Sequence, residues 1–314
     1  MHRQRVPRSN DHTYNNGMET KMLFIIIPVL NRWEQTRTCL KRLTSGSYRD
    51  FRIIVVDHGS TDGTGKGLRN EFPDIIHLPG STDMWWAGAT NLGIRKALDL
   101  GAEMVMLLNN DCYVETTTIE TLLDLQRNSG LSLVAPNQRG LQSGRTITGR
   151  VTTCFLLGFP VMRLPGRSTY RPGEHRLLGT RLILGGRGVL VPAPVFEQAG
   201  FFNEDRLPHY WSDHDFFLRC RKQGIPLYIA SDAVVDIDEE TTTLASRLGR
   251  MTFPRFIQSL HDRRSHRNLP ELAALFRLHY PLPGLYLLGV ALNVLRYTAV
   301  YFTARLLHIL GIRR

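Results

Sequence analysis

The first third of the chain carries three uninterrupted apolar runs, Met22–Val29, Arg52–Val56 and Met104–Leu108. Short runs of this kind, rich in isoleucine, valine and leucine, are typical of parallel strands that are buried on both faces. The segments between them show the residue spacing of helices: Glu34–Leu43, Asp62–Asn70 and Ala89–Leu100. This alternation predicts a doubly wound, mostly parallel α/β sheet. The carboxyl ends of its strands should share one edge, where ligands usually bind in such sheets.

The regular pattern weakens between 143 and 188, where arginine and glycine are frequent, and we expect short strands and loops there. Order then returns in a strand, a helix and two short strands: Gly185–Val191, Ser212–Gln223, Leu227–Ala230 and Ala233–Ile237. The predicted α/β domain therefore covers 22–240, with halves at 22–112 and 113–240.

The C-terminal region, 241–314, is predicted to be helical. Leu269–Tyr280 has helical spacing, and Gly284–Ile312 is strongly apolar. The uncharged part of this apolar segment ends at Leu295, short of the ~20 residues that a membrane-spanning helix needs. An arginine at mid-bilayer, such as Arg296, would also cost roughly 2.5–3.5 kcal/mol. These features disfavour a spanning helix.

Polar and small residues of this apolar segment gather mainly on one side if the segment is helical. Gly289, Asn293, Arg296 and Thr303 fall near one face, whereas Arg305 falls on the opposite side. We therefore expect a helix that lies in the interface of an anionic membrane surface, and so a peripheral protein. Packing on the protein itself, or in a homo-oligomer, is the alternative.

Composition narrows the classes of partner only partly. The net charge of +11 suits a phosphate-bearing ligand, an anionic membrane or nucleic acid. The four cysteines are scattered and form no C-x-x-C pair, which argues against a zinc ribbon or a disulfide framework and fits a reducing compartment. Residues 1–21 are polar and lack the apolar segment of a signal peptide, so we interpret them as a disordered extension.

The second apolar run ends in the first chemically suggestive cluster, Asp57-His58-Gly59-Ser60-Thr61-Asp62. A carboxylate at a strand end can accept hydrogen bonds from a nucleobase or a ribose hydroxyl. Backbone amides at the start of the next helix can hold phosphate. The structural alternative is a simple turn in which Asp62 caps that helix.

Polar residues also follow the third run, at Asn109, Asn110 and Asp111. Asp111 could hold a hard divalent cation that bridges two phosphates. Such a cation would neutralise the charge of a departing nucleoside diphosphate. A polar turn that ends the strand is the structural alternative.

A third cluster, Tyr210–Phe217, begins the predicted helix of the second half. Ser212 and Asp215 fit a capping box at the helix start. Asp213 is not needed for that cap, and the helix dipole in the first turn favours its ionised form. An ionised carboxylate is what a general base must be before it takes a proton.

Small residues before the third helix and basic residues near the C-terminus complete the candidate set. Trp86–Gly93 contains residues that would let a ligand approach the backbone closely, although Gly93 also fits tight helix–sheet packing. His261, His266 and the nearby arginines could contact phosphate, or could form a solvated basic face.

Taken together and in this order, the clusters resemble family 2 glycosyltransferases of the GT-A fold, particularly the rhamnosyltransferase-like branch of bacterial polysaccharide assembly. The similarity runs from about Met22 to Asp238. Asp213 matches the catalytic base of the family's E-D-x-D motif, and Asp111 the carboxylate of its D-x-D metal motif. The resemblance implies donor-binding residues at Pro28, Val29, Asn31, Asp57, Gly59, Ser60, Asp62, Trp86, Gly88, Asn91, Asn109 and Asn110. It implies acceptor-side residues at Gly185, Gly186, His209, Trp211 and Asp215.

Three positions depart from the family pattern. Ser212 replaces the glutamate before the base, and His58 replaces the asparagine of the D-N-G-S loop. Where many relatives have a metal-binding histidine, this chain has Asp236-Ile237-Asp238. Asp238 is therefore a candidate second ligand beside Asp111 for Mg²⁺ or Mn²⁺; a weaker metal site is the alternative.

The resemblance implies an inverting glycosyltransferase at the cytoplasmic face of the cell membrane. It would move a sugar from a nucleotide-diphosphate sugar, such as dTDP-rhamnose or a UDP-sugar, to a hydroxyl of a lipid-linked or polysaccharide acceptor. A nucleotidyltransferase would normally show a glycine-rich, lysine-containing loop, which Pro28–Thr36 lacks. A degenerate scaffold of the same fold stays an alternative. No nucleic-acid partner is expected, because basic motifs interleaved with aromatic residues are lacking.

Overall fold

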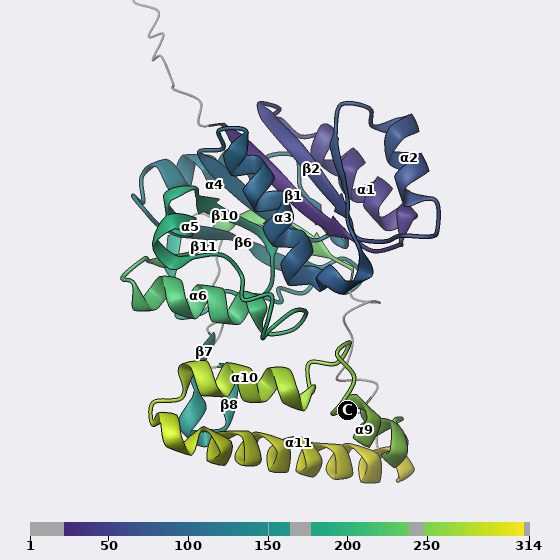
Figure 1. Cartoon of the computed structure of the whole chain (residues 1–314), viewed down its shortest axis with the longest axis vertical. Coiled ribbons are helices and arrows are strands. Elements are labelled where there is room, and N and C mark those ends of the chain that lie inside the picture. The colour runs from purple at the N-terminus through teal and green to yellow at the C-terminus, as the bar shows by residue number, and fades with distance from the viewer. Residues whose placement is uncertain (1–21, 150, 164–176, 239–247, 311–314) are drawn as a thin grey trace, which may run out of the picture.

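The structure is a computed structural model that describes residues 22–149, 151–163, 177–238 and 248–310. The predicted disordered extension, 1–21, lies outside the described residues. The domain is built on a nine-stranded sheet. Eight of its strands follow the order β3-β2-β1-β4-β10-β6-β11-β5, and the ninth, β9, pairs with β11. Helices cover both faces of this sheet (Figure 1).

The first half of the sheet is parallel throughout. Its strands are β1 (Leu23–Val29), β2 (Phe51–Asp57), β3 (Ile76–Pro79) and β4 (Met104–Leu108). Its helices are α1 (Trp33–Thr44), α2 (Thr64–Glu71) and α3 (Trp85–Asp99), with the 3-10 turn η1 (Thr82–Met84) before α3. The predicted alternation is confirmed, but α3 begins four residues earlier than expected, at Trp85.

The second half is mixed, so the expected predominance of parallel pairs holds only for the first half. Its strands are β5 (Cys112–Val114), β6 (Leu133–Gly140), β9 (Leu177–Gly179), β10 (Arg187–Pro192) and β11 (Leu227–Ile237). Strand β10 is antiparallel to β4 and β6, whereas β11 is parallel to β6. The two short strands predicted near the end of this domain are one strand, β11, with a register shift between Ala230 and Val234.

Each face of the sheet has its own core, as the alternation of side chains in β1 shows. Phe24 and Ile26 pack in the core beneath α3, and Ile25 and Ile27 pack in the core beneath α1. The first face also holds α5 (Pro194–Ala199), α6 (Ser212–Lys222) and α10 (Leu269–His279); the second holds α2 and α4 (Thr118–Arg127). Both faces of β1 are therefore buried, as its continuous apolar run predicts.

Beyond the sheet lies a smaller layer formed by segments that are distant in sequence (Figure 1). It contains the β7–β8 hairpin, the turns η2 and η3, and three helices: β7 (Val151–Cys154), η2 (Phe155–Leu157), β8 (Phe159–Arg163), α9 (Phe253–Ser259), α10, η3 (Pro283–Leu285) and α11 (Tyr286–Ile309). Helix α10 lies between the domain and α11, so it joins the two layers.

Helix α11 packs along its length on the other segments of this layer. Asn293 donates a hydrogen bond from Nδ2 to the Gly158 carbonyl at 2.7 Å, and Tyr301 donates one to the Met251 carbonyl at 3.1 Å. Gly289 packs so closely on α10 that an added Cβ would lie 2.5 Å from a ring carbon of Tyr280. The other side of the helix is exposed to solvent.

The predicted polar face of α11 contacts the protein at only some of its residues. Thr303, predicted on the same face as Gly289 and Asn293, is exposed. Arg305, predicted on the opposite face, donates a hydrogen bond to the Gly249 carbonyl, because the segment before α9 packs against the end of the helix. Arg296 does face the protein, with its guanidinium carbon 3.9 Å from the ring centroid of Phe159.

Candidate active site

The loops after β1 and β2 are joined by hydrogen bonds at the carboxyl edge of the sheet. The backbone N–H of Asn31 donates to Oγ of Ser60 at 2.6 Å, and the N–H of Thr61 donates to Oδ1 of Asn31 at 2.8 Å. The Ser60 N–H in turn donates to Oδ1 of Asp57 at 2.9 Å. Asn31 adopts a left-handed backbone with φ of 60°, which asparagine tolerates better than most residues. These bonds bring Asn31, Asp57 and Ser60 together, as the sequence predicts.

Asp62 occupies the start of two helices at once. Its carboxylate accepts the backbone N–H of Trp33, at the start of α1, and that of Thr64, at the start of α2. Burial acts against ionisation, but these hydrogen bonds and one from the Thr64 hydroxyl keep the pKa of Asp62 below its usual value. The capping alternative is therefore what the structure shows, and a donor contact at Asp62 stays a prediction.

The strand end at Asp57 is surrounded by histidines. The Asp57 carboxylate lies 3.8 Å from Nε2 of His77, and both side chains are largely buried. His58 follows in the chain and is also buried, which lowers its pKa. His58 is therefore neutral near pH 7, so it replaces the family's asparagine without adding a charge.

Trp86, Asn109 and Gly186 meet at the centre of the edge. The indole N–H of Trp86 donates to Oδ1 of Asn109 at 3.0 Å. A Cβ at Gly186 would lie 2.8 Å from a ring carbon of Trp86, so only glycine leaves room there. Neighbouring Asn110 instead donates to the Thr36 hydroxyl on α1. The structure thus joins the donor-side stretch at Trp86 to the predicted acceptor-side glycines.

The predicted donor residues Gly88 and Asn91 hold α3 against the loop after α5. Both polar atoms of the Asn91 side chain bond to the backbone of Phe202, at 2.9 and 3.0 Å, and the side chain is fully buried. A Cβ at Gly88 would lie 2.9 Å from a carboxylate oxygen of Glu204. Their observed role is packing, and donor contacts at these positions stay predictions.

Asp213 lies in the first turn of α6 and is held by its neighbours. Oδ1 accepts the His214 backbone N–H at 2.9 Å and lies 2.9 Å from Nδ1 of the same histidine. Burial raises the pKa of Asp213, but His214 and the backbone amides of His214 and Gly185 lower it below the usual value overall. Asp213 is therefore ionised at neutral pH, as a general base must be. Sequence reasoning missed His214, whose only signal was its position beside Asp213.

The predicted capping box at this helix is wrong. Trp211 precedes the helix with a left-handed φ of 66°, and no side chain caps the first turn. The hydroxyl of Ser212 is buried with no hydrogen-bond partner among the described residues. Asp215 turns away from the helix start, because its carboxylate accepts hydrogen bonds from His279 at 2.8 Å and from Arg219 at 2.9 Å.

Asp215 therefore joins α6 to α10. Its side chain is 2% exposed, and contacts with His279 and Arg219 outweigh burial to lower its pKa. A carboxylate engaged in this way supports the helix that carries Asp213. A direct acceptor contact at Asp215, which the resemblance implies, stays a prediction.

Two aromatic residues and His209 form the wall beside Asp213. His209 lies against Trp85, with ring centroids 5.5 Å apart, and Trp211 lies against His214 at 5.1 Å. Burial, together with the nearby His58 and Arg264, lowers the pKa of His209 to about 4. This wall is therefore largely aromatic, with His209 neutral near pH 7 and the Arg263 guanidinium 5.8 Å from the Trp85 ring centroid.

Asp111 and Asp238 are neighbours where β4 and β11 end. The backbone N–H of Asp238 donates to the Asp111 carbonyl at 3.1 Å, and the Asp238 carboxylate accepts hydrogen bonds from Gln35 and Gln142. Within the described ranges, no group of three or more His, Cys, Asp and Glu side chains is placed to hold a metal ion. Mg²⁺ is commonly held by one or two carboxylates, water and substrate phosphates, and metal binding by Asp111 and Asp238 stays a prediction.

Comparisons with known proteins agree with the predicted family. The family described as "Glycosyl transferase family 2" matches residues 24–180, half of the chain. The chain therefore belongs to the family 2 glycosyltransferases and is a transferase, as the sequence predicts.

Two relatives illustrate the extent of the sequence similarity. N-acetylglucosaminyl-diphospho-decaprenol L-rhamnosyltransferase of Mycobacterium tuberculosis is 25% identical over 216 residues, which are 62% of this chain and 69% of the relative. Glycosyltransferase GlyA of Streptococcus pneumoniae is 30% identical over 101 residues, which are 31% of this chain. This chain spans only 14% of the length of GlyA.

Solved structures share the fold at low identity. GalNAc-T7 with UDP, GalNAc and Mn²⁺ superposes with a TM-score of 0.59 at 12% identity, covering 84% of this chain and 59% of that one. S. aureus TarS 1-349 in complex with UDP-GlcNAc superposes with a TM-score of 0.53 at 13% identity, covering 92% of each chain. The predicted GT-A fold is confirmed.

Proposed function

We propose that this glycosyltransferase inverts the configuration of a sugar that it moves from a nucleotide-diphosphate sugar to a hydroxyl group. The observation that carries the proposal is the contact chain Trp86–Asn109–Gly186–Gly185–Asp213. It links a donor-side tryptophan and the end of β4 to an ionised carboxylate at the start of α6. A donor on one side and an acceptor hydroxyl on the other would meet between them.

In this proposal, Asp213 removes the proton from the acceptor hydroxyl. The oxygen forms a bond to the anomeric carbon, the bond to the leaving phosphate breaks, and the nucleoside diphosphate departs on the opposite face. One such displacement inverts the anomeric configuration. His214 orients the Asp213 carboxylate through its hydrogen bond and keeps it ionised.

Asp111, with Asp238 beside it, would hold a divalent cation. When bound, Mg²⁺ or Mn²⁺ neutralises charge on the leaving diphosphate. The relative GalNAc-T7, solved with UDP and Mn²⁺, and TarS, solved with UDP-GlcNAc, support a UDP-sugar as donor. The relative named as an L-rhamnosyltransferase acting on N-acetylglucosaminyl-diphospho-decaprenol supports a rhamnose donor and a lipid-linked acceptor instead.

We place the enzyme on the cytoplasmic membrane surface through α11. Four apolar residues at seven-residue spacing form one stripe on the solvent side, with exposed fractions of 54–68%: Leu288, Leu295, Phe302 and Ile309. The helix is long and apolar enough to cross a bilayer. Its opposite side is occupied by packing on α10 and on the Gly158 turn. If α11 lies in the membrane interface, its apolar stripe contacts the bilayer while its opposite side stays packed on the protein.

The test uses the full chain with Asp213→Asn. Calorimetry with UDP-GlcNAc and dTDP-rhamnose, with and without Mn²⁺, selects the donor; nucleoside diphosphate release on a panel of octyl glycosides selects the acceptor. Loss of the general base should lower turnover about 10²–10⁴-fold with donor affinity nearly unchanged. Asp74→Asn, at an exposed position after α2, is the matched control.

Two results would contradict the proposal. Near-normal turnover in the Asp213→Asn protein would remove Asp213 as the base. Donor binding by the unmodified chain without transfer to any acceptor would favour the scaffold alternative.

A further inference from the structure

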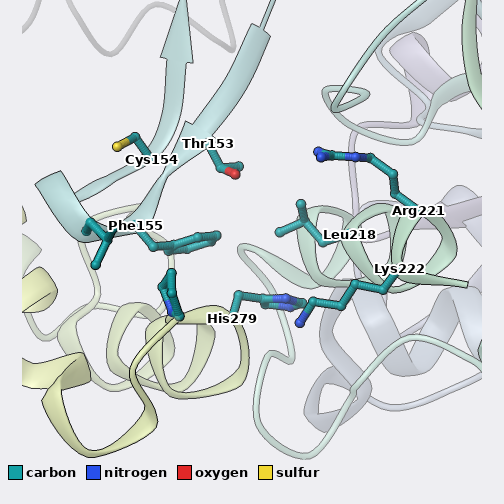
Figure 2. A pocket seen from close by; sticks show the side chains of 9 residues that line it. Thr153, Cys154, Phe155, Leu218, Arg221, Lys222 and His279 are labelled. Atoms are coloured by element: carbon teal, nitrogen blue, oxygen red, sulfur yellow. The ribbon is translucent and has the colours of Figure 1, made fainter.

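A separate cavity lies at the far end of α6 from Asp213. It has a volume of about 380 Å³ and is enclosed by the end of α6, by β7 with η2, and by the end of α10 (Figure 2). Its lining residues are Thr153, Cys154, Phe155, Leu156, Leu218, Arg221, Lys222, His279 and Pro281. We call it the α6–β7 cavity. Arg221 and Lys222 follow Asp213 by eight and nine residues in α6, which is roughly 12–14 Å along the helix axis.

One wall of the α6–β7 cavity is cationic. Arg221 and Lys222 both line it, and neither forms an ion pair with any described carboxylate. Arg221 donates one hydrogen bond, to the Arg181 carbonyl at 3.2 Å. Two adjacent cations without carboxylate partners, beside a cavity that opens to solvent, favour an anionic ligand.

His279 adds a polar group that is buried and incompletely bonded. The residue is 8% exposed, and its Nε2 lies 2.8 Å from the ionised Asp215 carboxylate, which favours the proton on Nε2. Its Nδ1 has no hydrogen-bond partner among the described residues. With the proton on Nε2, Nδ1 is a hydrogen-bond acceptor, and leaving it buried without a donor costs free energy. A hydroxyl group, or the P–OH of a singly protonated phosphate monoester, would donate to it and remove that cost.

The opposite wall is apolar and continues to the surface. Phe155 stacks on the His279 ring at 5.9 Å, and Leu156 and Pro281 also line the cavity here. Leu218 faces Phe155 from α6, where it lies beside the two cations (Figure 2). Leu156 and Leu157 are 47% and 62% exposed in the turn η2. This turn leads into Gly158, whose carbonyl bonds to Asn293 of α11. The apolar wall is thus continuous with the turn that contacts the proposed membrane helix.

We propose that the α6–β7 cavity binds a phosphate monoester that carries an apolar chain. The phosphate lies between Arg221, Lys222 and His279, and the chain follows Phe155 and Leu156 outward. The cations alone would also suit the carboxyl-terminal dipole of α6, but that explanation leaves the His279 Nδ1 and the apolar wall without a role. That the ligand comes from the membrane rests on the proposed function. The existence of the binding site does not depend on that function.

The test is calorimetric titration of the full chain with octyl phosphate, octanol and inorganic phosphate. Arg221→Gln with Lys222→Gln should weaken octyl phosphate binding at least about tenfold, because charge-assisted hydrogen bonds are lost. The matched control is Lys41→Gln with Arg42→Gln, an exposed adjacent pair in the last turn of α1. Equal binding by the two double variants would overturn the proposal.

The same titration separates the sources of affinity. Octanol and inorganic phosphate should each bind at least about tenfold more weakly than octyl phosphate. Inorganic phosphate that binds as tightly as octyl phosphate would overturn the apolar half of the proposal. Octanol that binds as tightly would overturn the anionic half.

Cys154 provides a second readout inside the cavity. It is half-buried, whereas Cys39, Cys112 and Cys220 are buried, so iodoacetamide should modify Cys154 first. Octyl phosphate should slow this reaction in the unmodified chain and in Asp213→Asn alike, and unchanged alkylation would overturn the proposal. If octyl phosphate protects Cys154 from alkylation even in an inactive Asp213→Asn protein, ligand binding in the cavity does not depend on the proposed catalysis.

Discussion

Strand β1 buries all seven of its residues, whereas α11 buries only Gly289, Asn293 and Tyr301 and leaves its leucines largely exposed. Both segments are strongly apolar in sequence. In β1, neighbouring strands and two helical layers cover every side chain. In α11, the fully buried contacts are made by Gly289, Asn293 and Tyr301, with Val290 partly buried beside them, whereas Leu288, Leu295 and other apolar side chains point outward. The apolar content of a segment therefore does not determine how much of it is buried. The extent of burial depends on which of its residues contact the rest of the protein.

The difference has a consequence for how each segment is stabilised. Burial of β1 contributes to folding itself, at roughly 25 cal/mol per Å² of apolar surface. The exposed stripe of α11 contributes nothing to folding in water and becomes favourable only against another apolar phase. Contiguous exposed apolar surface of this kind typically marks an interaction site.

The largest expected effect sharpens this comparison through stability. Ile26→Ala in β1 should lower the free energy of unfolding by about 2–5 kcal/mol, because it leaves a cavity in a fully buried site. Leu295→Ala in α11, at a side chain that is 65% exposed, should change it by less than about 0.5 kcal/mol. Urea unfolding measures both. A large loss for Leu295→Ala would show that the stripe is covered within the protein and would break the comparison.

The sequence predicted the β1 half more closely than the α11 half for a physical reason. A strand covered on both faces must be apolar throughout, so the runs ending at Val29 and Leu108 locate β1 and β4 almost to the residue. The side of α11 that contacts the protein depends on where η2 and α9 pack. The sequence of the helix specifies neither contact, so the hydrogen bond from Arg305 to the Gly249 carbonyl could not be predicted from it.

The candidate site shows the same division. Asp57 and Asn109 follow from the sequence as residues at the carboxyl ends of β2 and β4, and Asp213 as a residue in the first turn of α6, because strand ends and helix starts are local features of sequence. The role of Asp215 depends on His279, which is 64 residues away, and no local pattern could show it. Spacing alone gave a capping box there, since it could not reveal a competing partner on α10.

The next effect is on membrane binding. Leu288→Ser with Leu295→Ser should weaken binding to phosphatidylglycerol-containing vesicles by about 3 kcal/mol, roughly 150-fold, if each side chain is half-buried in the interface. Leu131→Ser with Leu141→Ser, at exposed leucines of the α/β domain, should leave it unchanged. Vesicle sedimentation measures the binding. Vesicle binding could instead be unchanged in the Leu288→Ser, Leu295→Ser variant. If light scattering then showed that this variant is monomeric and the unmodified chain dimeric, the stripe would be a subunit interface.

The smallest effect concerns the glycine that docks α11. Gly289→Leu should lower the free energy of unfolding by about 1–3 kcal/mol, since a Cβ would lie 2.5 Å from Tyr280 and 2.7 Å from Phe276 and would force α10 and α11 apart. Ala291→Leu, at an exposed position two residues later in the same helix, is the control and should have almost no effect. Urea unfolding and limited proteolysis of the C-terminal region measure the change. If Gly289→Leu matched the control, close packing at glycine would not fix the orientation of α11, and the outward direction of its leucines would need another cause.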